Sequence, residues 1–86
     1  MKLNPSQVTK IETAIRDHCD SRLNGEEGDK SISLFHRLRD AGEEGVRISK
    51  KLACRQGAAL LDLGIAVWAA GSLVVSMEGV RNLLQR

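Results

Sequence analysis

The chain has 86 residues and a formal net charge of +2 at pH 7, which limits it to one small domain. One Phe, one Trp and no Tyr occur, so the core must be mainly aliphatic, as in packed helices. Two cysteines are too few for a disulfide framework and lack the spacing of a zinc motif. The N-terminus has no apolar signal segment. We therefore expect a reducing, cytoplasmic location.

The first predicted element is an amphipathic helix that spans approximately residues 5–22. Asn4 suits the N-cap, and Pro5 suits the first helical position, where its missing N–H has no partner to lose. Apolar residues three and four apart share one face: Val8, Ile11, Ile15 and Cys19. The Asn-Gly pair at residues 24–25 then predicts a turn.

A second amphipathic helix is predicted over residues of about 31–41. Its apolar face consists of Leu34, Phe35, Leu38 and Ala41. Gly42 suits the residue with positive φ that often follows a helix. The next helix can begin anywhere from Glu43, where acidic residues favour a helix start, to Ser49, which could cap it.

The third element is predicted to be a long, mostly apolar helix over residues of about 46–84, because no strong stop signal precedes Met77. Gly57, Gly64 and Gly71 are seven residues apart. Since glycine weakens a helix interior, this spacing suggests close approach of a neighbouring helix. The sequence thus predicts an all-α fold in which residues 1–86 form one domain of two short amphipathic helices and one long C-terminal helix.

The long helix is expected to mediate association, because two short helices cannot cover its apolar surface and soluble monomers avoid large exposed apolar areas. A second copy of the chain, as a dimer or higher oligomer, or another protein should cover the remainder. The predicted interface comprises Leu60, Leu61, Gly64, Val67, Trp68, Gly71, Val74 and Val75.

A membrane span is the second hypothesis, because residues 58–77 are long enough to cross a bilayer. Basic residues before this segment would keep the N-terminus in the cytoplasm of an inner-membrane protein. Its aliphatic residues favour insertion by about 3–4 kcal/mol, but Asp62 opposes it by up to about 3 kcal/mol. A buried Asp62 would need a partner such as Arg55, Lys51 or a basic residue of another chain.

The basic cluster Arg47, Lys50, Lys51 and Arg55 is a candidate anion-binding site. The spacing of Ala53 and Gly57 is similar to that of a helix-turn-helix, whose second helix should carry polar residues that contact bases. Residues 58–64 are mostly apolar instead, and the net charge is small. We therefore expect a solvated basic face, and a nucleic-acid accessory protein is only the third hypothesis.

The sequence contains no recognisable catalytic arrangement. His18 and Cys19 are neighbours on a helix, so their side chains diverge and cannot form a nucleophile pair. His36 and Cys54 lack partners at metal-ligand spacing. We expect no enzyme activity, metal or cofactor. The leading hypothesis is a small protein–protein interaction module, such as a homo-oligomeric adaptor, chaperone or inhibitor.

Overall fold

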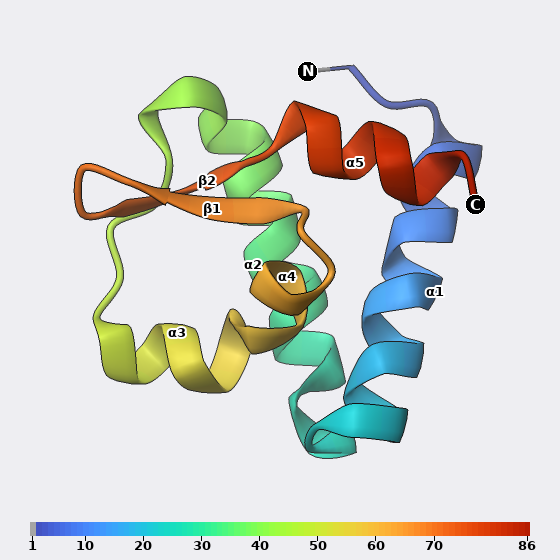
Figure 1. The fold of residues 1–86 in the computed structure, drawn as a ribbon, viewed down its shortest axis with the longest axis horizontal. Helices are drawn as coiled ribbons and strands as arrows, with labels where there is room; N and C mark the ends of the chain where they lie inside the picture. The colour runs from blue at the N-terminus through green and yellow to red at the C-terminus, as the bar shows by residue number, and fades with distance from the viewer. Residues whose placement is uncertain (1) are drawn as a thin grey trace.

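The computed structural model describes residues 2–86 as a mostly helical fold with one small β-hairpin (Figure 1). Its dimensions are 29 × 28 × 17 Å, so the molecule is flattened along one axis. Its elements are α1 (Pro5–Arg22), η1 (Gly25–Glu27), α2 (Gly28–Ala41), η2 (Gly42–Glu44), α3 (Lys50–Gln56), α4 (Ala58–Asp62), β1 (Ala66–Ala69), β2 (Ser72–Val75) and α5 (Met77–Leu84).

The first two helices follow the sequence prediction. At the start of α1, the Gln7 N–H donates to Asn4 Oδ1 at 2.8 Å, and the Asn4 N–H donates to Gln7 Oε1 at 3.0 Å. These bonds satisfy two of the donors that a helix start leaves free, and Pro5 occupies the first helical position as expected. Helix α2 begins three residues earlier than predicted and ends before Gly42, whose φ is +61°.

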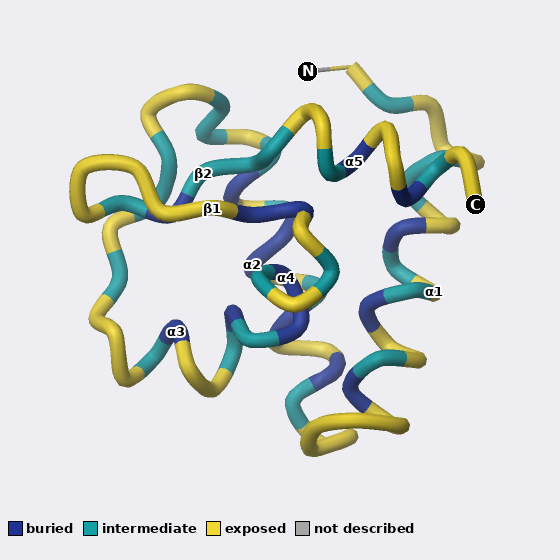
Figure 2. The backbone as a smooth tube through the Cα atoms, viewed as in Figure 1, coloured by how far each residue is buried: buried dark blue, intermediate teal, exposed yellow. Residues whose placement is uncertain are grey.

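The core lies where α1, α2, α4, the hairpin and α5 meet (Figure 2). Helices α1 and α2 supply aliphatic and aromatic side chains from one face each, as their spacing predicted. Helix α5 packs on α1, and the Lys10 ammonium donates to the carbonyl oxygens of Leu84 and Arg86. The fully buried large side chains are Ile11, Ile15, Leu34, Phe35, Leu38, Leu60, Ile65, Leu73 and Val80.

The predicted long helix over residues 46–84 is wrong. That region contains two short helices, a hairpin and a third short helix. Ser49 caps α3 by accepting a hydrogen bond from the Leu52 N–H at 3.1 Å, and Ser76 caps α5 by accepting one from the Gly79 N–H at 3.2 Å. The fold is therefore not all-α, and residues 46–84 do not form the long helix that was expected to mediate association.

The three glycines that are seven residues apart lie at the ends of elements or between them, and they do not line one face of a helix. Gly57 separates α3 from α4. Gly64 has a φ of +76°, which an ordinary residue rarely adopts and which ends the helical segment. Gly71 forms the hairpin turn with Ala70, with φ values of +85° and +51°, as a two-residue type I′ turn requires.

None of the helices in residues 2–86 combines the length and the apolar character needed to cross a bilayer. Residues 58–77, which were predicted as an alternative membrane span, contain α4, the hairpin and the first residue of α5. The β-branched side chains within this segment favour the extended backbone of β1 and β2 instead.

Gly79→Ala should be strongly destabilising. A Cβ at this position of α5 would collide with the carbonyl oxygen of Gly64, and backbone cannot move aside as a flexible side chain can. We expect a loss of about 1–3 kcal/mol or more in the free energy of unfolding, measured by urea denaturation. The matched control is Gly28→Ala in α2, where the new methyl would meet only ordinary contacts at 3.6–4.0 Å. Its effect should stay within about 1 kcal/mol.

Ala70→Asn should stabilise the hairpin. Ala70 is the one non-glycine residue with positive φ among those described, and Asn tolerates this conformation far better. We expect the free energy of unfolding, measured by thermal or urea denaturation, to increase by about 0.5–1 kcal/mol. Gly71→Ala, at the next turn position, should have the opposite sign; equal effects from both changes would contradict this turn geometry.

Candidate interaction surface

The hairpin presents two different faces, because successive side chains of a strand point to opposite sides. Antiparallel pairing places Val67 opposite Val74 and Trp68 opposite Leu73. Leu73 is fully buried, so the face that it shares with Trp68 packs toward the body of the molecule; we call this the inner face. The outer face carries Val67, Ala69, Ser72 and Val74.

The outer face is apolar and accessible. Val67 is 44% exposed, and Met77 at the start of α5 is 48% exposed. A groove of about 410 Å³ is lined by Gly42, Glu43, Ala69, Val74, Val75 and Met77. Val67 is not part of this lining but lies opposite Val74 in the strand pairing. Glu43 is the only charged residue in this lining. A groove with mostly apolar walls and few polar groups suits an apolar side chain of a partner.

The two edges of the hairpin differ. Beyond β2, the Val46 N–H donates to the Leu73 carbonyl at 2.8 Å, and the Leu73 N–H donates to the Val46 carbonyl at 2.9 Å. Because antiparallel strands alternate the direction of their backbone groups, Trp68, opposite Leu73, directs its own N–H and carbonyl away from β2. The edge of β1 is therefore the open edge of the hairpin at Trp68.

The structure gathers five of the eight predicted interface residues on the hairpin: Val67, Trp68, Gly71, Val74 and Val75. Leu60 in α4 is fully buried and takes no part in a surface. Leu61 lies in α4, and Gly64 lies in the loop after α4, so neither is on the hairpin. Sequence reasoning missed Met77, Ala69 and Gly42. The signal for them was the pair of β-branched segments flanking Ala-Gly, which predicts a hairpin rather than a helix.

Asp62 is paired but not buried. It ends α4 with a side chain that is 51% exposed, and its Oδ2 lies 3.1 Å from Nε2 of His18 on α1. The partner is therefore His18 rather than the expected Arg55 or Lys51. An exposed carboxylate with a partner on a neighbouring helix needs no further role beyond joining α4 to α1.

The predicted anion-binding residues remain exposed but do not share one helical face. Arg47 lies in the extended segment before α3, Lys50 and Lys51 form the first turn of α3, and Arg55 lies in its last turn. Arg55 Nη2 is 3.5 Å from Glu27 Oε1. Within residues 2–86, Arg47, Lys50 and Lys51 form no ion pair. Three exposed cations therefore remain without an internal partner.

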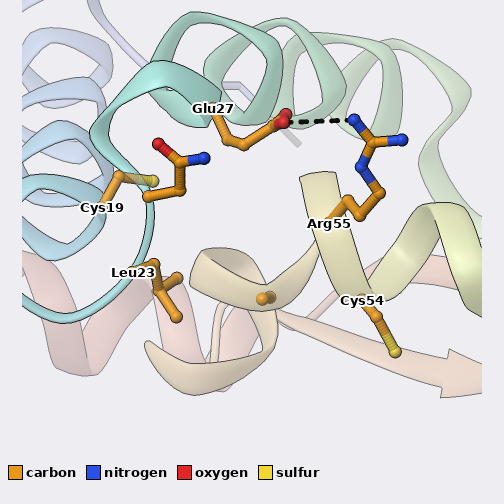
Figure 3. A pocket seen from close by; sticks show the side chains of 7 residues that line it. Cys19, Leu23, Glu27, Cys54 and Arg55 are labelled. Carbon is orange, nitrogen blue, oxygen red and sulfur yellow. Dashed lines mark ion pairs between the residues drawn. The ribbon is translucent and has the colours of Figure 1, made fainter.

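A second cavity of about 300 Å³ lies between the end of α1 and α3 (Figure 3). It is lined by Cys19, Leu23, Asn24, Glu27, Cys54, Arg55 and Ala58. Oε2 of Glu27 is buried there without a hydrogen bond, although the Lys30 ammonium lies 4.0 Å away. Figure 3 shows the Glu27 carboxylate directed toward Arg55, and the Cys54 sulfur directed away from both of these side chains.

No histidine lines this cavity, so neither thiol has an imidazole base beside it there. No group of three or more His, Cys, Asp or Glu side chains suited to a metal ion occurs in the described part of the chain. No family model, no curated protein and no solved structure matches this chain. The hairpin surface and the basic residues are therefore the features from which a function can be argued.

The two free cysteines should differ sharply in reactivity. Cys54 is exposed, whereas Cys19 is 1% exposed on the core face of α1. We expect one thiol per chain to react rapidly with a disulfide reagent in the native state and two in denaturant. Cys54→Ser should remove the fast phase; fast reaction of that variant would show that the Cys19 site is open.

Proposed function

We propose that this protein is a non-enzymatic protein-interaction module that associates with a second copy of itself through the outer face of the hairpin. The observation that carries the proposal is the exposure of Val67 and Met77 beside a mostly apolar groove. Two large apolar side chains exposed to water beside a mostly apolar groove favour association, because association removes them from water.

Self-association is supported by symmetry. The groove and the exposed side chains lie next to each other on one surface, so two copies related by a two-fold axis can each insert Met77 or Val67 into the groove of the other. A chain of 86 residues also buries a smaller share of its surface alone than a larger domain does, so it gains stability from such contacts.

The module would act as an adaptor, chaperone or inhibitor whose activity lies in binding. We further propose a cytoplasmic location, where thiols stay reduced; the two free cysteines support it.

Val67→Lys should disrupt this association. A lysine at the centre of the contact would lose its hydration in the dimer, and Glu43, the one carboxylate in the groove lining, would also have to leave water to pair with it. We expect the wild-type mass to rise from monomer to dimer with concentration in sedimentation velocity. The variant should dimerise about 30-fold or more weakly, equivalent to about 2 kcal/mol.

The matched control is Leu23→Lys, which places the same charge at an apolar residue of similar exposure, 40%, at the end of α1. It should dimerise like the wild type, and circular dichroism should show that both variants keep their helices. A wild-type chain that stays monomeric at every concentration would overturn the proposal. Equal dimerisation of the Val67→Lys variant would exclude the outer face as the contact.

A further inference from the structure

The longest stretch of the chain without an acidic residue is also basic. Residues 45–61 contain no Asp or Glu and four basic residues, all exposed. Only Arg55 has a carboxylate partner, Glu27, and their 3.5 Å separation makes this a loose pair. The fold therefore leaves the positive charge of Arg47, Lys50 and Lys51 without internal compensation among the described residues.

Two of these cations lie where the fold alone disfavours them. Lys50 and Lys51 form the first turn of α3, and no acidic residue is present in that turn. The N-terminus of a helix carries partial positive charge, so cations there cost stability. Such a local conflict is expected where a residue serves binding rather than folding.

Trp68 lies on the α3 side of the hairpin. It shares the inner face with Leu73, whose Cδ2 is 3.4 Å from the position of a Cβ at Gly57, directly after α3. Val46, which pairs with Leu73 on its other edge, directly precedes Arg47. The indole is nevertheless 42% exposed. The one tryptophan of the chain thus faces the side of the hairpin on which α3, with Lys50 and Lys51 in its first turn, lies.

From this placement we propose that the basic residues and Trp68 form a binding surface for single-stranded nucleic acid. Arg47, Lys50 and Lys51 would contact phosphates, while a base stacks on the exposed indole. Stacking is tolerant of sequence because every base has an aromatic face. Trp68 lies on the opposite face of the hairpin from the proposed protein contact, so the two binding partners need not compete for it.

A single strand fits better than a duplex or an acidic protein. The helix after α3, which would have to enter a major groove, has only five residues, buries Ala59 and Leu60, and ends in the acidic Asp62. Asp62 is its only polar residue, so α4 lacks the set of side chains that would read base edges. An acidic protein would use the cations but would leave the exposed indole without a specific partner.

The test uses the intrinsic fluorescence of Trp68, which reports on this site alone because the chain has one Trp and no Tyr. Full-length protein is titrated with 12-nucleotide oligothymidylate and oligouridylate at low salt and at monomeric concentration. We expect saturable quenching and a plot of log K against log salt with a slope of about −2, as three phosphate contacts on a single strand predict.

Charge and stacking are separated by variants measured with labelled oligonucleotides. The double change Lys50→Glu, Lys51→Glu should weaken binding at least 10-fold and bring the slope close to zero. Trp68→Leu should weaken binding about 10-fold with the slope unchanged, and Trp68→Phe should restore most of the affinity. Lys2→Glu, a charge reversal at an exposed residue near the N-terminus, should change affinity less than threefold.

Several results would overturn the proposal. These are no binding of either oligonucleotide at low salt, binding without quenching, or equal effects of Lys2→Glu and Lys51→Glu measured singly. If a 12-base-pair duplex binds more tightly than the single strands, the ligand is a duplex and the proposal of a single strand is wrong. Oligoglutamate that binds as tightly, and independently of Trp68, would assign the surface to an acidic protein. A difference between the two oligonucleotides would show whether DNA or RNA is preferred.

Discussion

The backbone pairing of Val46 with Leu73 joins the two halves of this chain. It ties the segment before α3 to the hairpin that follows α4, so everything between them forms a closed loop. The Leu73 side chain is fully buried, and its Cδ2 lies 3.4 Å from the position of a Cβ at Gly57. Gly45 must have no side chain for this approach, since a Cβ there would lie 2.6 Å from the Leu73 carbonyl oxygen. The position of the hairpin, and hence of both proposed surfaces, depends on this contact.

The sequence predicted the first half of the fold well because its signals are local. Asn4, Pro5 and Gly42 mark helix ends through hydrogen bonds and dihedral angles that involve only near neighbours. The apolar spacing of α1 and α2 likewise predicted which faces are buried.

The second half was mispredicted because its pattern supports two structures. Alanine and leucine around residue 60 favour a helix, and glycines seven residues apart are typical of a face that packs closely on a neighbouring helix. Their actual role depends on backbone conformation, since Gly64 and Gly71 adopt positive φ that a helix would not need. The β-branched residues of β1 and β2 were the available contrary signal. The candidate site residues on the hairpin do lie close together, but on two opposite faces. Which face each residue belongs to follows only from the strand pairing, which the sequence did not predict.

The turn at Ala70 and Gly71 determines the register of the strands, and through the register it determines which side chain belongs to which surface. Val67 and Trp68 are neighbours in sequence, yet they contribute to opposite faces. Because side chains alternate along a strand, a shift of the register by one residue would exchange them. A one-residue insertion or deletion beside the turn would then turn Val67 toward α3 and Trp68 toward the apolar groove. In evolutionary terms, the two surfaces cannot vary independently, since one change in loop length alters both at once.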